Sequence, residues 1–383
     1  MDNKIFIASE FKCIKFQGDY YLPPKAYNIY KRYADSFGPV ILCSRFLEVE
    51  EKPSGYYTAN FIIDVIEINS LISVLLGDYN TIIKRKIADC DLVIARVPSI
   101  IAYKASDCAH KLDKKCLTES MGDAWDAYWY HGDLLGKIIA PYMEIKMKNV
   151  VAHSNYAIYV TKKYLQKKYP CKCKNIYASN VYIQPTDEKV LEQRIKKIEA
   201  MDFNNISVMT SACVETVAKG HRYVIEMISV LKKEKINVTY FLAGSGNQER
   251  LKKVARQYGV EDNVIFLGEV TLKEIYYYLD KTDLYIQPSL QEGLPRAVIE
   301  AMSRGCPCIG SETAGTPELL PKNCIFKRKS ARAIKDTLKA QLDTKKLVEN
   351  AIRNFRESQQ YCENTLKQRR DNFFTMITNE IKS

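Results

Sequence analysis

The chain has few of the residues that special architectures need. Of its 383 residues, 16 are glycine, 13 proline and two tryptophan, which excludes collagen-like, low-complexity and disordered chains. Its longest apolar stretch, residues 61–79, is interrupted by Asp64, Glu67 and Asn69, so no span of about 20 apolar residues crosses a membrane. The rest is ordinary globular composition, long enough for two domains.

Metal ligands at suitable spacing are also scarce. The twelve cysteines are scattered, and no secretory signal precedes them, so we expect a reducing compartment. The two C-x-C pairs, at 171–173 and 306–308, are too short to form a four-ligand zinc site without a second pair. Asp89–Asp91 has the D-x-D form of a metal motif but directly precedes a predicted strand. We therefore expect no metal and no cofactor.

A full G-x-G-x-x-G followed by an acid about 20 residues later is missing, which argues against a dinucleotide oxidoreductase. The net charge of +12 is uneven, because Lys137–Lys174 contains nine lysines and one acid, Glu144. Such a segment suits an anionic membrane surface or an anionic substrate, or it is simply a solvated helix face. No nucleic-acid motif accompanies it, so no nucleic-acid partner is expected.

Short β-rich runs alternate with helical patterns along the whole chain, which predicts parallel α/β structure. The sequence pattern changes near Pro185, where the alternation is interrupted by a polar helix. The predicted domains are an N-terminal Rossmann-like domain, residues 1–185, and a C-terminal Rossmann-like domain, residues 186–354. A final helix, about 355–383, presents apolar residues on one face and is expected to join the N-terminal domain.

The most informative segment is SLQEGLPRAVIEAMSRGCPCIGSETAGTPELL, residues 289–320. A strand ends near Pro288, a loop follows with Glu292 and Gly293, and Pro295 is the expected first residue of a helix. Free N–H groups at the start of that helix make a site for phosphate or another anion. Within the helix, Glu300 lies among apolar residues and needs partners. These are either Arg296, one turn earlier, backbone N–H groups, or the hydroxyls of a ribose.

Two glutamates separated by seven residues, within EGLPRAVIEAMSRGCPCIGS and followed by AGTPELL, resemble the signature of glycosyltransferase family 4. These are retaining, sugar-nucleotide-dependent enzymes of the GT-B fold, in which two doubly wound Rossmann-like domains face a cleft. The resemblance covers roughly residues 206–322 and the C-terminal helix. It implies that Glu300 binds the ribose, that Glu292 binds the donor sugar, and that Lys219, in VAKGHRYVIEMI, neutralises the diphosphate.

The resemblance also implies further donor contacts, which are Gly293, Leu294, Pro295, Glu269 and Val270. One departure from the family pattern concerns a second cation that would bind the diphosphate beside Lys219. The family often has a Gly-Arg pair before the lysine, whereas this chain has TSACVETVAKG. His221 or Arg222 are the candidates to compensate. The glycines of LAGSGNQERL, Gly244 and Gly246, are interpreted as structural.

The N-terminal half resembles the family much less. Gly18 is assigned to the first strand-to-helix loop, near donor and acceptor. The loop CLTESMGDAWDAYWYHG contains carboxylates and both tryptophans, a combination that suits carbohydrate. Asp123, Asp126 and His131 are therefore candidate acceptor or sugar contacts. The alternative is an aromatic-rich loop packed on its own domain.

The resemblance thus implies a retaining, metal-independent hexosyltransferase, whose residues 1–185 bind the acceptor and whose residues 186–354 bind the nucleotide sugar. It would move a sugar from a nucleoside-diphosphate sugar, with uridine favoured, to a growing, lipid-linked glycan of a surface polysaccharide. Its expected place is the cytoplasm, at the inner face of the cell membrane. The alternative is a non-catalytic sugar-nucleotide-binding protein of the same fold, or an inverting transferase or epimerase.

Overall fold

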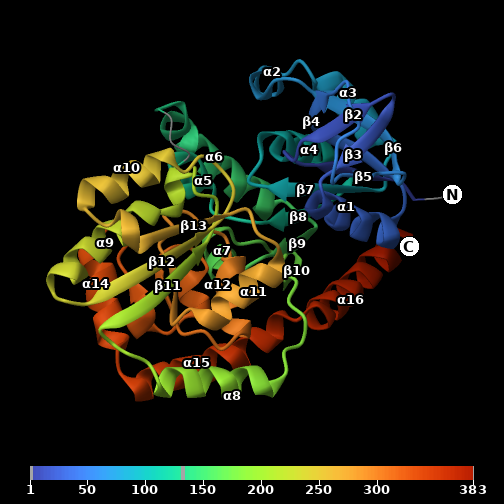
Figure 1. Cartoon of the computed structure of the whole chain (residues 1–383). Helices are drawn as coiled ribbons and strands as arrows, with labels where there is room; N and C mark the ends of the chain where they lie inside the picture. Colours follow the sequence, from blue (N-terminus) through green and yellow to red (C-terminus); the bar gives the residue numbers. More distant parts are fainter. Residues whose placement is uncertain (1–2, 131–133, 383) are drawn as a thin grey trace. The chain divides into compact units, whose positions relative to one another are not determined.

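The computed structural model describes residues 3–130 and 134–382. The chain divides into two compact α/β units, each with its own sheet (Figure 1). The first unit comprises Met1–Trp125, Ile139–Ala178 and Lys367–Ser383, and the second comprises Asp126–Ile138 and Ser179–Leu366. The predicted α/β class is therefore confirmed.

The sheet of the first unit has a parallel core extended by a hairpin. Its strands run in the order β10-β9-β8-β7-β1-β4-β2-β3-β5, with β6 also paired to β4. The parallel strands are β1 (Ile5–Ala8), β4 (Val40–Glu48), β6 (Ile62–Ile68), β7 (Leu92–Val97), β8 (Lys115–Ser120), β9 (Tyr156–Tyr159) and β10 (Lys174–Tyr177). Strands β1 and β7 are wholly buried, as expected for a parallel sheet covered on both faces.

An insertion follows β1 before the first helix is reached. It is the hairpin β2 (Cys13–Phe16) and β3 (Asp19–Leu22), which continues to the short β5 (Tyr57–Thr58). Between β3 and β10 the chain forms the helices α1 (Pro24–Phe37), α2 (Leu71–Leu76), α3 (Asn80–Ala88), α4 (Ile100–Lys111), α5 (Ala124–Trp129), α6 (Leu134–Ala152) and α7 (Tyr164–Lys168). Sequence patterns predicted β1, α1, β4, β7, β8 and β9 but not the hairpin.

The second unit contains a doubly wound sheet in the order β13-β12-β11-β14-β15-β16. Its strands are β11 (Asn205–Ser211), β12 (Asn237–Ala243), β13 (Val264–Gly268), β14 (Leu284–Gln287), β15 (Cys308–Ser311) and β16 (Ile325–Phe326). The chain moves outward from β11 to β13 and then returns to the other side of β11 with β14. Ligands of such sheets bind where the order reverses, at the carboxyl ends of the strands.

Helices surround this sheet. They are α8 (Glu188–Glu199), α9 (His221–Lys233), α10 (Glu249–Tyr258), α11 (Leu272–Lys281), α12 (Arg296–Ser303), α13 (Thr316–Leu319), α14 (Ala331–Gln341) and α15 (Thr344–Ser358). The polar helix predicted after Pro185 is α8, and its N-cap is Asp187, whose side chain accepts from the Lys189 N–H. Because α15 packs on α8 and α12, it belongs to the second unit rather than to the return segment expected from residue 355.

The return to the first unit is made by α16 (Glu363–Lys382). A 3-10 turn at Gln359–Tyr361 separates it from α15, and Ile183 pairs with Cys362 just before it begins. From Lys367 onward the helix belongs to the first unit, and in Figure 1 it lies beside α1. Phe373, Phe374 and Ile377 are part of the core of that unit.

Candidate functional site

A cavity of about 520 Å³ lies at the carboxyl ends of the strands of the second unit. Residues at or after the ends of β11, β12, β13 and β14 line it, together with the first turns of α12. This is the point where the strand order reverses between β11 and β14. The cavity is therefore in the place where ligands bind to doubly wound sheets. The lining residues include Cys213, Lys219, Gly244, Glu269, Val270, Gln287, Glu292, Leu294, Pro295, Arg296 and Glu300.

Lys219 is held at the cavity by a tight approach of two loops. It ends a 3-10 turn, Val217–Lys219, and Gly220 follows with a left-handed φ of 71°. A Cβ at Gly220 would lie 2.1 Å from the carbonyl oxygen of Pro288, so only glycine fits. The Leu290 N–H also donates to the Ala218 carbonyl at 2.7 Å. The Lys-Gly pair thus fixes the lysine against the segment that follows β14.

The Glu292 carboxylate is the neighbour of this lysine. Its Oε1 lies 2.8 Å from the Lys219 Nζ and accepts from the Gln287 Nε2 at 3.0 Å. The Tyr285 hydroxyl donates to the Gln287 Oε1 at 2.8 Å and orients that amide. Charge-assisted bonds of this kind hold the carboxylate in one position. Gln287 and Tyr285 are supporting residues that the sequence analysis did not identify.

Glu300 lines the same cavity from the second turn of α12. Within residues 3–130 and 134–382, no hydrogen bond or ion pair reaches its carboxylate, so the Arg296 salt bridge, one of the alternatives left open by the sequence, is not formed. Burial raises the pKa of Glu300, and the nearby Arg296 charge lowers it by a smaller amount. A half-buried carboxylate without a protein partner is a good acceptor for hydroxyl groups of a ligand.

Helix α12 directs its N-terminus at the cavity. It begins one residue later than predicted, because Pro295 is the N-cap and Arg296 the first helical residue. The Ile299 N–H is the first to bond back along the helix, at 3.5 Å to the Pro295 carbonyl. The N–H groups before it and the positive end of the helix dipole form an anion site.

Lys219 and Arg296 are the cationic side chains among the described residues that line the cavity, and neither His221 nor Arg222 is among them. His221 is 1% exposed, and its Nε2 lies 3.2 Å from the Cys213 carbonyl oxygen. Burial lowers the pKa of His221 to about 4, so the ring is neutral near pH 7. Arg222 is exposed and lies over the Tyr223 ring. Arg296, in contrast, lines the cavity, and no ion pair engages its guanidinium in the described part of the chain.

The remaining predicted donor contacts are close to this site. Glu269 and Val270, which follow β13, and Leu294 line the cavity. Gly293 lies between two lining residues, and its carbonyl accepts from the Gly315 N–H at 2.8 Å. Gly244, which the sequence analysis treated as structural, also lines the cavity. A Cβ there would lie 2.0 Å from the Ala212 carbonyl oxygen, so two strand ends approach closely at this point.

Gly18 lies in a hairpin that the connection from β1 to α1 contains. Gln17 and Gly18 form the two-residue turn of the β2–β3 hairpin, with φ of 48° and 89°. Such turns need left-handed backbone at both positions, which favours glycine. Gly18 is therefore the turn residue of a hairpin inserted between β1 and α1, and its contact with donor and acceptor stays a prediction.

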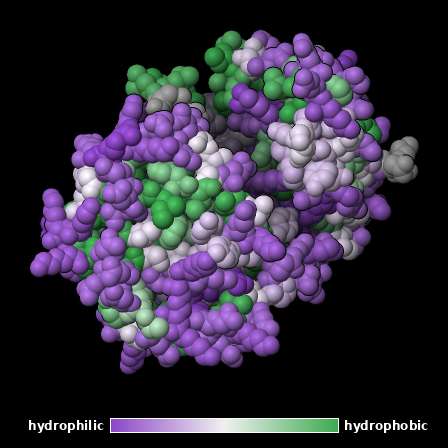
Figure 2. Space-filling model, viewed as in Figure 1, coloured by the Kyte–Doolittle hydropathy of each residue, from purple (hydrophilic) through white to green (hydrophobic). Residues whose placement is uncertain are grey.

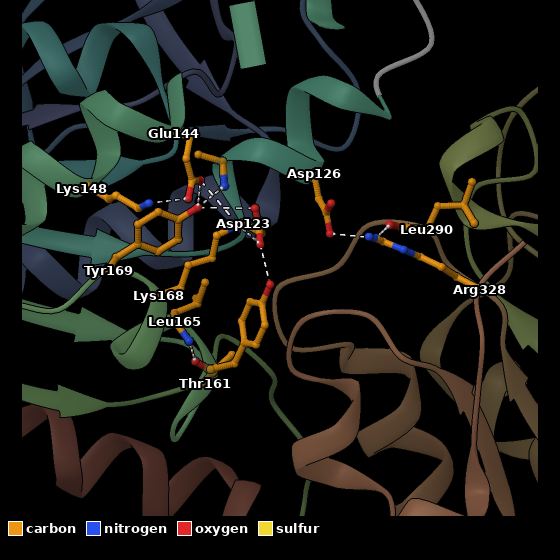
Figure 3. A network of polar contacts seen from close by, with 12 residues as sticks. Asp123, Asp126, Glu144, Lys148, Thr161, Leu165, Lys168, Tyr169, Leu290 and Arg328 are labelled. Carbon is orange, nitrogen blue, oxygen red and sulfur yellow. Dashed lines mark hydrogen bonds and ion pairs between the residues drawn. The ribbon is translucent and has the colours of Figure 1, made fainter. Parts of the chain in front are cut away.

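Asp123 is part of a buried network rather than an open sugar contact (Figure 3). Its carboxylate is 1% exposed and accepts from the Tyr164 hydroxyl at 2.6 Å and from the Lys168 Nζ at 2.5 Å. Lys168 also lies 3.5 Å from Glu144. Because a buried carboxylate requires such partners, we assign Asp123 to the stability of the first unit and no longer to acceptor binding.

Asp126 belongs to the second unit and supports the loop before Glu292. The Arg328 Nη1 donates to its Oδ2 at 3.0 Å and to the Leu290 carbonyl at 2.9 Å (Figure 3). Arg328 thus ties α5 to the site loop, and the Asp126 carboxylate is 8% exposed. Through Arg328, Asp126 helps to position the loop that precedes Glu292. His131 lies outside the described residues.

Neither a metal-binding cluster nor a membrane-spanning helix is found in the described part of the chain. Among residues 3–130 and 134–382, no group of three or more His, Cys, Asp or Glu side chains could hold a metal ion. No helix within the same ranges is both long and apolar enough to cross a bilayer.

Comparisons with known proteins fit this geometry. The model of the glycosyl transferases group 1 family matches residues 191–358. Protein CapJ of Staphylococcus aureus is 32% identical over 335 residues, which cover 85% of this chain and 83% of that protein. The amylovoran biosynthesis glycosyltransferase AmsK of Erwinia amylovora is 37% identical over 115 residues, 28% of each chain. This chain belongs to the group 1 glycosyl transferases.

The fold is shared with solved glycosyltransferases. The structure of Anabaena HepE in complex with UDP matches with a TM-score of 0.66 and 15% identity, and covers 98% of this chain and 100% of that one. At this identity the likeness shows the fold alone. The GT-B fold that the resemblance implied is confirmed, and the chain is a glycosyltransferase.

Proposed function

We propose that this protein is a retaining hexosyltransferase that moves a sugar from a nucleoside-diphosphate sugar to a growing glycan in surface polysaccharide synthesis. The observation that supports the proposal is the cavity in which Lys219, Arg296 and the N-terminus of α12 lie together with the Glu300 carboxylate. Cations and helix N–H groups suit a diphosphate, and an unpaired, half-buried carboxylate suits a ribose.

In this proposal each side chain has a distinct task. The diphosphate lies against Lys219, Arg296 and the first N–H groups of α12, and Glu300 accepts from the ribose hydroxyls. Glu292, oriented by Lys219 and Gln287, accepts from a hydroxyl of the donor sugar. The bond between the anomeric carbon and the phosphate oxygen breaks, and an acceptor hydroxyl attacks on the same face. Its proton passes to the departing phosphate oxygen, whose charge Lys219 stabilises.

The donor base and the acceptor are proposed from the similar proteins. Uridine is proposed because the solved neighbour HepE binds UDP in its crystal. Polysaccharide synthesis is proposed because AmsK is an amylovoran biosynthesis enzyme. A lipid-linked acceptor would place the enzyme at the cytoplasmic face of the cell membrane.

A panel of nucleotide sugars tests the proposal. Calorimetry with UDP, GDP and their hexose conjugates identifies the donor, and a glycosyl acceptor then gives a product whose anomeric configuration NMR reads directly. Retained configuration is expected. An inverted product would show an inverting transferase, and binding without transfer or hydrolysis would favour the non-catalytic alternative.

Removal of the Glu300 carboxylate is expected to weaken donor binding. Glu300→Ala should cost about 1.5–3 kcal/mol, the value of a hydrogen bond to a charged acceptor. Because burial raises the pKa of Glu300, its ionised form is lost as pH falls through that raised pKa, and donor affinity should fall with it. Calorimetric titrations at decreasing pH should show this loss in the wild type, beginning above the ordinary range of a glutamate.

The Glu300→Gln variant separates this effect from titration of the ligand. It should bind less tightly at pH 8 and lack the part of the pH dependence that Glu300 causes. Glu249→Gln, at an exposed carboxylate of the same unit outside the cavity, is the matched control and should behave as wild type. Equal donor affinity in a folded Glu300→Ala protein would refute the ribose assignment.

Transfer is expected to proceed without a divalent metal. Lys219, Arg296 and the α12 N-terminus supply positive charge where the diphosphate departs. The initial rate in excess EDTA should equal the rate with added Mg²⁺ or Mn²⁺. Complete loss in EDTA that metal restores would contradict this and would direct attention to Asp89 and Asp91.

A further inference from the structure

The cavity of the second unit reaches across four neighbouring strands. Glu269 and Val270, which follow β13, line one side, and Gln287 of β14 and Glu292 of the next loop line the other. In the strand order β13-β12-β11-β14, three intervals of about 4.8 Å separate β13 from β14. The β13 side and the β14 side of the cavity are therefore about 14 Å apart, which suits a nucleoside diphosphate in an extended conformation.

The two sides of the cavity differ in chemistry. Lys219, Arg296 and the N-terminus of α12 supply positive charge on the β14 side. The apolar residues that line the β13 side are Ala243, Val270, Leu272 and Ile275. In Figure 2 hydrophobic side chains gather over the region of β13. Because apolar walls suit the flat faces of an aromatic ring, the β13 side fits the base of a nucleotide and the β14 side its diphosphate.

The backbone before and after Glu269 is fixed. Gly268, the last residue of β13, has a left-handed φ of 70°, and its carbonyl accepts from the Gly244 N–H at 2.8 Å. Thr271, the N-cap of α11, forms a capping box with Glu274. The Glu269 side chain is exposed at the cavity, and no hydrogen bond or ion pair engages its carboxylate in the part of the chain that the structure describes. This carboxylate is therefore available to the edge of a base.

A carboxylate distinguishes bases by one ring proton, since it accepts hydrogen bonds and donates none. Uracil at N3 and guanine at N1 carry an imino N–H, which donates to a carboxylate. Cytosine and adenine have a lone pair on the corresponding ring nitrogen, which a carboxylate repels. Hydrogen bonds to a charged acceptor are about twice as strong as neutral ones, so this single proton gives a marked preference.

We propose that Glu269 selects the base of the donor by accepting from a ring imino N–H. This deepens the proposed function, on which it rests, because it favours uridine or guanosine diphosphate sugars over those of cytidine and adenosine. The apolar residues of the β13 side contact the faces of the base, and the carboxylate contacts its edge. Guanine also offers its 2-amino group to the second carboxylate oxygen, whereas uracil has a carbonyl group on each side of N3–H. Comparison of GDP with UDP distinguishes these two bases.

Calorimetry with matched pairs of nucleoside diphosphates tests this selection. UDP and CDP have the same ribose and diphosphate and differ only at positions 3 and 4 of the ring. Wild type should bind UDP at least about tenfold more tightly than CDP, because CDP lacks one hydrogen bond to a charged acceptor. GDP and ADP are the corresponding purine pair, and the comparison is made within the pair that contains the tighter ligand. Equal binding within that pair would overturn the proposal.

Glu269→Gln is the variant that isolates the carboxylate. The glutamine amide accepts from an imino N–H through its oxygen and donates to the bare ring nitrogen of cytosine or adenine through its nitrogen. The preference within the pair should therefore fall about tenfold, to near one. Glu261→Gln replaces an exposed carboxylate that precedes β13 and does not line the cavity, so it should keep the wild-type preference. Because both positions are exposed, melting should be unchanged. A wild-type preference in Glu269→Gln would refute the role of this carboxylate.

Glu300→Ala separates ribose binding from base selection. It should weaken both members of a pair by the same factor and leave their ratio unchanged, since their riboses are identical. UDP binding without any preference over CDP would refute the base selection and leave the donor site intact. If wild type binds none of the four nucleotides, the donor site itself is refuted, and the base selection falls with it.

Discussion

Replacing Lys219 by alanine is expected to lower the rate of transfer by about 10²–10³-fold, the usual cost of removing one group that stabilises charge in a transition state. The lysine is fixed in the cavity by Gly220, whose backbone touches Pro288. Its Nζ lies 2.8 Å from the Glu292 Oε1, and the Lys219 side chain is 28% exposed, so a departing phosphate can reach it. Its loss should affect turnover more than donor affinity or folding.

Lys335→Ala is the matched control. Lys335 lies 2.8 Å from Glu234, the same separation as in the Lys219–Glu292 pair, and has similar exposure at 21%, but it is on α14 outside the cavity. Its variant should transfer at the wild-type rate. Surface pairs of this kind contribute at most about 1 kcal/mol to stability, so both variants should melt close to the wild type.

Arg296→Ala tests the second cation in the same assay. If Arg296 binds the diphosphate, its removal should lower donor affinity and turnover, and Lys219→Ala/Arg296→Ala should fall below either single variant. Arg222→Ala should have no effect, because Arg222 is not at the cavity. Wild-type turnover of a folded Lys219→Ala protein would refute the catalytic assignment.

The fold of the second unit was predictable because its signals are local. Each strand from β11 to β15 is a short apolar run between helical patterns, and alternation of that kind favours a parallel sheet. The strand β16 has only two residues, Ile325 and Phe326, too few to give any periodic signal. The first unit was harder to predict, because a hairpin interrupts the usual strand-to-helix step after β1.

Those site residues that lie in a recognisable local motif could be predicted from the sequence. Glu292, Lys219 and Glu300 lie in motifs whose glycines and proline fix the backbone, and all three line the cavity. Gln287 is a residue of β14, and only the fold directs its amide to Glu292. His221 followed a glycine at a helix start, which suggested phosphate binding, but its ring is buried against Tyr240. Burial by distant residues leaves no signal in a single sequence.

The second large effect is expected on the stability of the first unit when Phe374 of α16 is replaced by alanine. Its ring lies 5.5 Å from that of Tyr33 and 5.0 Å from that of Phe37, both on α1. The side chain is 2% exposed in the core of the first unit. Phe374→Ala should lower the free energy of unfolding of that unit by about 3–5 kcal/mol. Since whole domains are stable by only about 5–15 kcal/mol, the unit would become marginal.

Hydrogen exchange followed by mass spectrometry locates this effect. Amides of β1, β4 and β7 should lose protection in Phe374→Ala, whereas those of β11, β12 and β14, in the sheet of the second unit, should keep it. Thr375→Ala, at an exposed position of the same helix, controls for helix propensity and should exchange as wild type. Deletion of residues 365–383 should give the stronger form of the same pattern, because Phe373 and Ile377 are lost as well. Unchanged protection of β1 and β4 in both variants would show that α16 does not stabilise the first unit, despite its aromatic contacts there.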